Sequence, residues 1–278
     1  MPLPTIAQAL PYVNWIVLVS LGVGAFAYAA VAREVTDATR GYLGFTAVSG
    51  ALLAGLALAS DFALPQPTAL VINEAPPVLN GVRQAGLAVF AVLALVYTIA
   101  LRRRSRRTLP LAVLSLAGAI AAFLAAAIGW APTLPDSIPL LVQLTVLSAA
   151  AGGALAALAL GHWYLVTPRL SERPLILLTR ILSAVIAVQL ALFVVWTTVA
   201  GGPGQEPFRS FTTGPALFVW LRLIVGLAFP LVLAWMALRT AMTRSMESAT
   251  GLLYLALAAV VSGTIAAAAV YVGSGFLV

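Results

Sequence analysis

Charged residues are scarce in this 278-residue chain, and cysteine and lysine are missing altogether. Only 8% of the residues are charged and 62% are hydrophobic, whereas a typical soluble domain has about 25% charged residues. So few charged side chains cannot cover the surface of a soluble domain of this length, so we expect lipid as the solvent. The lack of cysteine excludes disulfides and thiolate metal sites. The lack of lysine excludes a Schiff-base chromophore such as retinal and any lysine nucleophile.

The basic residues are fifteen arginines, and there is a single histidine. An alanine-, leucine- and arginine-rich composition without lysine is typical of prokaryotes with GC-rich genomes. The net charge of +7 does not indicate nucleic-acid binding, because the arginines lie where membrane topology places them. We therefore expect membrane lipids, and no nucleic acid, as partners.

Long apolar stretches make up most of the sequence. A helix that crosses a bilayer needs about 20 predominantly apolar residues, and the segments between such stretches are rich in proline and glycine, which end helices. Eight stretches qualify: 12–33, 42–60, 85–102, 109–131, 138–166, 173–200, 214–241 and 248–276. The sequence predicts an all-α, polytopic integral membrane protein of about eight transmembrane helices, with a single transmembrane domain over 1–278.

The placement of arginine predicts the orientation, because cytoplasmic connections are enriched in basic residues. Alternate gaps hold eleven of the arginines, namely Arg33, Arg40, Arg102, Arg103, Arg104, Arg106, Arg107, Arg169, Arg173, Arg239 and Arg244. The other gaps hold only Arg83 and Arg209. We expect the arginine-rich connections in the cytoplasm and both termini on the extracytoplasmic side of the cell membrane. Four acidic residues then fall outside: Asp61, Glu74, Asp136 and Glu206.

The longest connection, about residues 61–84, is an external loop in this orientation, with apolar pieces between prolines. It would lie along the membrane surface, cap a site or dock an external partner. A weak internal repeat is also visible, because the segment that begins at Gly118 echoes the one that begins at Gly263. The repeat predicts two four-helix halves, 1–131 and 138–278, although an alanine-rich chain also produces such matches by chance.

Two arginines lie inside predicted spans. Arg180 is about 10 Å into the sixth span from the cytoplasmic side, and Arg222 is about 12 Å into the seventh span from outside. A guanidinium in the membrane costs several kcal/mol unless it is paired or reaches the interface. Each arginine therefore either snorkels to the nearer interface or donates to an anion, a headgroup or a carbonyl oxygen.

Amides and aromatic residues gather at the depth of Arg222. Gln189 lies in the outer half of the sixth span and shares a helical face with Trp196, and Trp220 enters the membrane from the same side as Arg222. The predicted outer pocket consists of Asn14, Gln143, Gln189, Trp196, Trp220 and Arg222, and Pro230 is expected to kink the seventh span below it. The alternative is an ordinary interfacial belt formed by the tryptophans Trp15, Trp130, Trp196 and Trp220.

A second set lies at the cytoplasmic side, where His162 closes the fifth span. A single histidine excludes a bis-histidine haem within this chain. His162 as the ligand of a five-coordinate haem, or of a haem shared with another subunit, stays a minor alternative, and we predict no other metal site. If Arg180 faces the fifth helix, His162 and Arg180 are placed to bind a quinone carbonyl. Otherwise His162 is an ordinary interfacial histidine.

No acidic residue lies deep in any predicted span, which argues against proton- or sodium-coupled transport. No self-contained catalytic motif is present, so the enzymatic role that we favour is at most that of an oxidoreductase subunit. The four-plus-four arrangement resembles the membrane subunits of the polysulfide-reductase (NrfD-like) family, which use two four-helix bundles and bind quinol. The resemblance is architectural, covers the whole chain and transfers no site residue.

This resemblance implies a membrane subunit of an electron-transfer or respiratory complex that binds quinone, or another lipid-soluble ligand, and anchors partner subunits. Three alternatives stay open. The first is a transporter or channel for a small solute that is not coupled through an intramembrane carboxylate. The second is a structural or assembly subunit without a ligand, and the third is a membrane enzyme acting on lipid.

Overall fold

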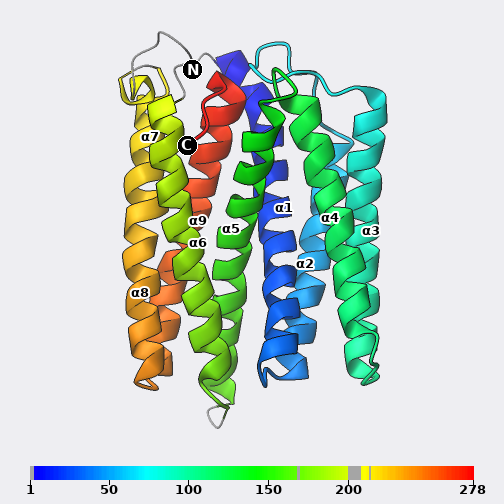
Figure 1. The fold of residues 1–278 in the computed structure, drawn as a ribbon, viewed down its shortest axis with the longest axis vertical. Helices are drawn as coiled ribbons and strands as arrows, with labels where there is room; N and C mark the ends of the chain where they lie inside the picture. Colours follow the sequence, from blue (N-terminus) through cyan, green and yellow to red (C-terminus); the bar gives the residue numbers. More distant parts are fainter. Residues whose placement is uncertain (1–2, 168–169, 200–207, 213) are drawn as a thin grey trace.

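The structure is a computed structural model, and it describes residues 3–167, 170–199, 208–212 and 214–278. Every long element in these ranges is a helix, and eight spans are long and apolar enough to cross a membrane. The predicted all-α fold with eight spans is thus confirmed (Figure 1). Arg169, Glu206 and the proline- and glycine-rich segment 201–204 lie outside the described residues.

The spans follow one another with short connections. The seventh span is made of three consecutive segments, an α-helix, a π-helical turn and a second α-helix. In chain order the elements are α1 (Leu3–Val35), α2 (Arg40–Asp61), α3 (Pro77–Arg102), α4 (Thr108–Trp130), α5 (Ser137–Val166), α6 (Arg173–Val199), η1 (Arg209–Phe211), α7 (Ala216–Leu223), η2 (Ile224–Ala228), α8 (Phe229–Met242) and α9 (Met246–Ser274).

The third span begins at Pro77, about two turns before the predicted start at residue 85. Proline suits the first turn of a helix, because the backbone N–H that it lacks would have no partner there. The connection between α2 and α3 is therefore 62–76 and not 61–84. This correction matters for function, because it places Asp61 at the end of α2 and Arg83 within α3.

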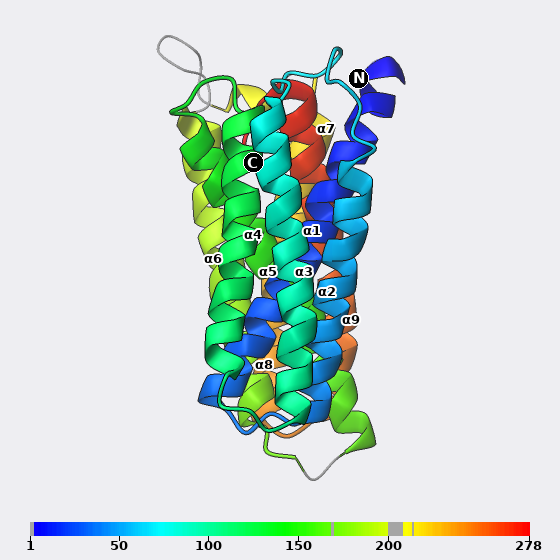
Figure 2. The ribbon, with the colours of Figure 1, turned by 90° about the vertical axis from the view of Figure 1, so that its right-hand side faces the viewer.

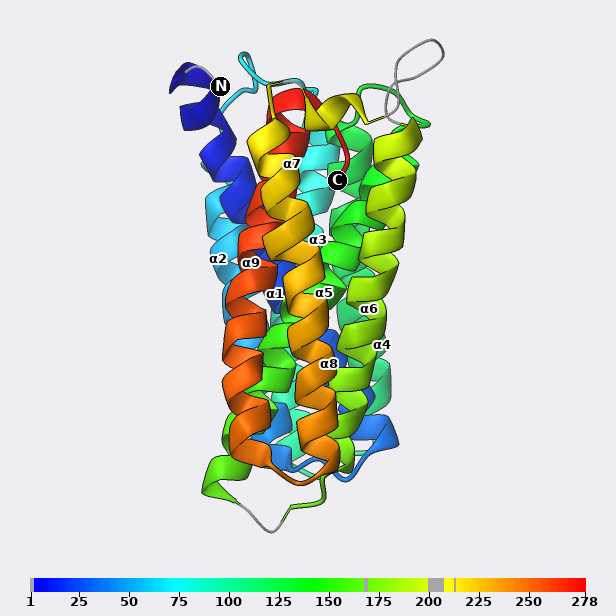
Figure 3. The ribbon, with the colours of Figure 1, turned by 90° about the vertical axis from the view of Figure 1, so that its left-hand side faces the viewer.

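Both chain ends lie at the same end of the bundle, together with the connections 62–76 and 131–136 (Figure 1). We call this the termini end. The opposite end, the arginine end, holds the connections 36–39, 103–107 and 243–245. Each span therefore runs the full height of the bundle, as Figures 2 and 3 show from the two sides.

The centre of the bundle is formed by α1 and α5. In each of these helices 72% of an apolar 18-residue segment is buried inside the bundle, compared with 33% in α6 and in the α7–α8 span. A Cβ atom added to Gly24 of α1 would lie 1.8 Å from the carbonyl oxygen of Ser148 in α5, and one added to Gly152 would lie 2.2 Å from the backbone nitrogen of Ala25. Small residues let helix backbones approach closely in lipid, and here they set the central contact.

Around this centre, α1–α4 lie on one side and α5–α9 on the other (Figure 1). In each group the third and fourth spans cross at a pair of glycines. These spans are α3 and α4 in the first group and α7–α8 and α9 in the second. A Cβ atom on Gly86 would lie 2.6 Å from the carbonyl oxygen of Gly118, and one on Gly226 would lie 2.4 Å from the Cα of Gly263. The two repeat segments noted in the sequence thus make the same kind of crossing, while duplication of the halves stays a prediction.

Candidate functional site: two buried arginines

Arg222 of α7 lies inside the bundle with only 2% of its surface exposed. Its Nη2 donates a hydrogen bond to Oε1 of Gln189 in α6, at 3.0 Å. The Nε2 of Gln189 in turn donates to the carbonyl oxygen of Val146 in α5, at 2.5 Å. The structure therefore brings together two of the predicted pocket residues, and the side chain of Arg222 does not snorkel to an interface.

Two nitrogens of Arg222, Nε and Nη1, are buried without a partner in the described part of the protein. The guanidinium lies against two glycines, since a Cβ atom on Gly226 or Gly263 would come within 3.4 or 3.0 Å of Nη1. The ion pairs among the described residues do not include Arg222. A buried charge without a counter-charge is strongly unfavourable in a membrane, so this site is suited to receive oxygen atoms from a ligand.

The segment after Arg222 departs from α-helical geometry. Ile224–Ala228 form a π-helical turn, and α8 follows with Pro230 in its first turn. We predicted a kink at Pro230, and the irregularity is instead the π turn just before it. Proline has no N–H to donate to the carbonyl four residues earlier, so the local hydrogen-bond pattern has to change there. Single π turns occur frequently at functional sites.

An aromatic cluster, which we call the aromatic cover, lies nearer the termini end than the Arg222–Gln189 pair. Phe211 of η1 makes edge-on contacts with Phe193 of α6 and with Trp220 of α7, at centroid distances of 5.8 and 4.9 Å. Phe193 is buried, whereas Trp220 is 47% exposed on the outside of the bundle. The segment with η1 bridges the ends of α6 and α7 (Figure 3). Nothing in the sequence around Phe211 signalled this contact.

The other predicted site residues are more dispersed. Gln143 is buried one turn from Val146 on α5, and its Nε2 donates to the carbonyl oxygen of Val278 at 3.1 Å. Trp196 is half-buried, and Asn14 is exposed on α1. Among the predicted outer residues, Arg222, Gln189 and Gln143 are thus the ones buried in the bundle, and Asn14 does not line an enclosed site.

The predicted inner pair does not form an enclosed site either. His162 of α5 and Arg180 of α6 are both exposed on the outside of the bundle. For Arg180 this placement fits a side chain that reaches the interface or the lipid headgroups. For His162 it fits the ordinary interfacial histidine.

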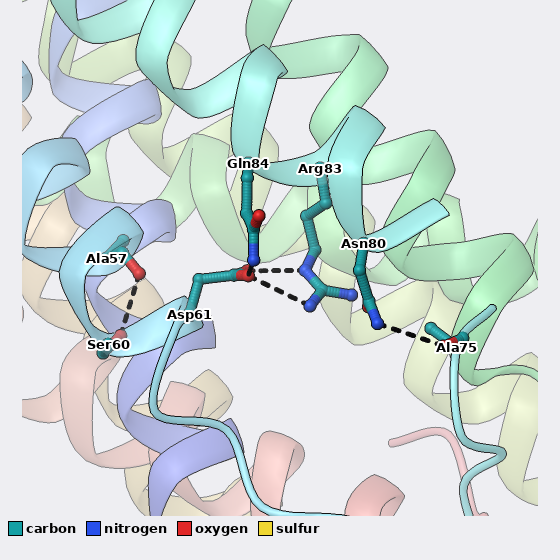
Figure 4. A network of polar contacts seen from close by, with 7 residues as sticks. All are labelled: Ala57, Ser60, Asp61, Ala75, Asn80, Arg83 and Gln84. Atoms are coloured by element: carbon teal, nitrogen blue, oxygen red, sulfur yellow. Dashed lines mark hydrogen bonds and ion pairs between the residues drawn. The ribbon is translucent and has the colours of Figure 1, made fainter. Parts of the chain in front are cut away.

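Sequence reasoning missed a second buried arginine at the termini end. Arg83 of α3 forms a two-pronged ion pair with Asp61 of α2, with Nε 2.5 Å from Oδ2 and Nη2 3.1 Å from Oδ1 (Figure 4). Gln84 donates to the same carboxylate at 2.9 Å. We had placed Asp61 and Arg83 in an external loop, because no signal marked the first turns of α3 as helix.

Tryptophans enclose this ion pair. The guanidinium carbon of Arg83 lies 5.9 Å from the ring centroid of Trp15 and 5.1 Å from that of Trp130, within the range of cation–π attraction. Trp15 and Trp130 are 0% and 1% exposed. These two tryptophans therefore line an internal polar cluster and are not part of a lipid-facing belt, a role that the exposed Trp220 can fill.

The two arginines hold corresponding places in the two groups of helices. Each follows the start of its helix by six residues, a rise of about 9 Å. Arg83 precedes the crossing glycine Gly86 by three residues and Arg222 precedes Gly226 by four, and the extra residue falls in the π turn. The partners differ, because Asp61 is a carboxylate and Gln189 is a neutral amide. Asp61 thus balances the charge of Arg83, whereas Arg222 has no counter-charge among the described residues.

The chain matches no family model, no curated protein and no solved structure. Its class therefore rests on the fold itself. Eight apolar helices with short connections define a multi-pass α-helical membrane protein, by length and composition. Within the described residues no cluster of His, Asp and Glu side chains is placed to hold a metal ion.

Proposed function

We propose that this protein is the membrane subunit of an electron-transfer complex and that it binds quinone, or another lipid-soluble ligand with a carbonyl oxygen, at Arg222. The observation that carries the proposal is the pair of buried nitrogens on Arg222, beside Gln189, that have no partner among the described residues. A carbonyl oxygen would accept from these nitrogens and relieve the unfavourable burial of unpaired donors. A quinone offers such oxygens on an otherwise apolar ring.

The surroundings of Arg222 support a ligand that arrives from lipid. Phe193, Phe211 and Trp220 form the aromatic cover, and Trp220 extends it to the outside of the bundle. A flat apolar ring can pack edge-on or offset against such side chains. We expect Phe211 to move aside when the ligand enters, because it is the ring that lies between α6 and α7.

A quinone site also needs an electron partner. Helices fill nearly all of the described chain, and the short connections leave the ends of the bundle free to anchor partner subunits. We propose that the redox centres belong to such partners and that this chain supplies the site within the membrane. The predicted orientation places Arg222 in the extracytoplasmic half.

The test begins with the protein purified from native membranes, whose organic extract should contain quinone. Decylubiquinone should quench the tryptophan fluorescence of the purified chain saturably, and Arg222→Leu should weaken binding about tenfold or more, as expected for lost charge-assisted hydrogen bonds. The control is Arg180→Leu, which removes an exposed arginine and should leave the affinity unchanged. Unchanged binding by Arg222→Leu, or equal loss in both variants, would refute the proposal.

A second candidate function, a transporter for a small solute, is favoured by one observation. A cavity of about 220 Å³ lies under the 62–76 connection at the termini end. Flux of a small solute into liposomes that contain only this chain would support transport. Quinone binding without any flux would favour the first proposal.

A further inference from the structure

The cavity under the 62–76 connection is formed by the ends of α1–α4 and does not involve Arg222. Its volume of about 220 Å³ is below the range of about 300–1,000 Å³ that is usual for drug-sized ligands. Arg83 and Asp61 form part of its wall, together with Trp130 and Tyr12. It therefore has room for one small molecule, with both polar and aromatic walls.

The 62–76 connection forms the roof of the cavity, and hydrogen bonds to three other parts of the protein hold it in place. Gln8 of α1 exchanges two hydrogen bonds with the roof, one to Thr68 and one from the backbone of Ala69, both at 2.8 Å. Asn73 donates to the carbonyl oxygen of Ala131 beyond α4 at 2.7 Å. The backbone nitrogen of Val71 donates to Val272 of α9 at 3.3 Å. The cavity is thus preformed, which reduces the entropy that binding would cost.

Each amide in the wall uses one of its two N–H donors within the protein. Gln84 donates to Asp61, Gln66 donates to Glu74 at 3.2 Å, and Asn80 donates to the carbonyl oxygen of Ala75 at 3.1 Å. The second N–H of each amide stays available as a donor, and its oxygen stays available as an acceptor. The wall therefore presents both donors and acceptors to a bound molecule.

A buried charged group lies behind this wall. Nη1 of Arg83 is buried without a partner in the described part of the protein, and it points toward the side of Asn80 in Figure 4. The charge of Arg83 is already balanced by Asp61, and Glu74 adds a negative charge at the rim. An anion is therefore disfavoured, and the site fits a neutral molecule that both donates and accepts hydrogen bonds.

We propose that this cavity binds a small neutral polyhydroxyl compound of the sugar or polyol class. Each hydroxyl both donates and accepts, so it can pair with the free N–H groups and with the oxygens of the wall amides. The C–H face of such a ligand would pack on the aromatic walls formed by Tyr12 and Trp130. This proposal is independent of the quinone proposal, because the two sites share no residue.

The test uses the full chain in lipid nanodiscs and calorimetric titration with D-glucose and myo-inositol as probes. L-alanine, choline and phosphate serve as zwitterionic, cationic and anionic comparators. We expect saturable binding of at least one polyol, weakened about three- to tenfold by Asn80→Ala, which is the effect of one neutral hydrogen bond. Asn14→Ala is the matched control, because Asn14 is exposed and outside the cavity, and it should bind as the parent protein does.

A variant at Arg83 would also break the buried ion pair, so Gln66→Leu on the roof provides the second test. Gln66 is exposed at the roof of the cavity, and its loss should weaken polyol binding without unfolding the protein. Binding of neither polyol, or binding that all variants leave unchanged, would overturn the site. Preferential binding of alanine, choline or phosphate would overturn the proposed ligand class.

Discussion

Replacing Asp61 by asparagine should destabilise the folded protein more than almost any other conservative change, because it leaves the charge of Arg83 buried without its counter-charge. The side chains of Arg83 and Asp61 are 3% and 0% exposed, and three hydrogen bonds converge on the carboxylate. Removing one partner of such a pair costs about 3–5 kcal/mol. At about 1.4 kcal/mol per tenfold change, the folding equilibrium should shift by roughly two to three and a half orders of magnitude.

The chain supplies its own control, an exposed ion pair at the arginine end. Arg244 and Glu172 lie 3.6 Å apart, with side chains 61% and 36% exposed. A pair of this kind contributes at most about 1 kcal/mol. Glu172→Gln should therefore change stability by less than 1 kcal/mol.

The assay is reversible unfolding of the purified protein in mixed detergent micelles, followed by tryptophan fluorescence. Trp15 and Trp130 enclose Arg83, so they report directly on this region. The double variant Asp61→Leu/Arg83→Met should regain most of the lost stability, because removing both charges leaves no unpaired ion. The reasoning is refuted if Asp61→Asn loses no more stability than Glu172→Gln, or if the double variant is less stable than Asp61→Asn.

Three further predictions test the packing, the charge of Arg222 and the orientation. Gly24→Ala should destabilise the protein by about 1–3 kcal/mol or more, because the added Cβ would lie 1.8 Å from a backbone oxygen of α5. The control is Gly55→Ala, whose Cβ would meet nothing within 4 Å and which should be neutral in the same unfolding assay. Arg222→Leu should be at least as stable as the parent protein, because it removes a buried charge that has no counter-charge among the described residues. A loss of several kcal/mol would show that Arg222 has a structural counter-charge. Because the chain has no cysteine, Thr68→Cys should react with a membrane-impermeant maleimide on intact cells while Ser105→Cys reacts only after lysis, and the reverse pattern would invert the predicted orientation.

The candidate sites show how far sequence reasoning could reach. Arg222 and Gln189 are polar residues inside apolar spans, which makes them stand out in the sequence. Both lie at a similar depth from the extracytoplasmic side, and this was enough to predict that they belong to one pocket. Asp61 and Arg83 gave no such signal, because a charged residue beside a proline-rich connection is expected in solvent. Arg83 lies inside the bundle because α3 begins at Pro77, so that Arg83 is part of this helix and not of the connection before it.

The sequence by itself determined the class of protein and its eight spans, because a bilayer imposes length and apolarity on each helix separately. Those are local properties that composition can show. Which face of each helix turns inward depends on contacts between segments far apart in the chain, such as the approach of Gly24 to α5. The tertiary structure therefore decided that Asp61 balances the charge of Arg83 and that, among the described residues, Arg222 bonds to an amide. The reason is that the partner of a buried charge is set by packing between helices and not by its neighbours in sequence.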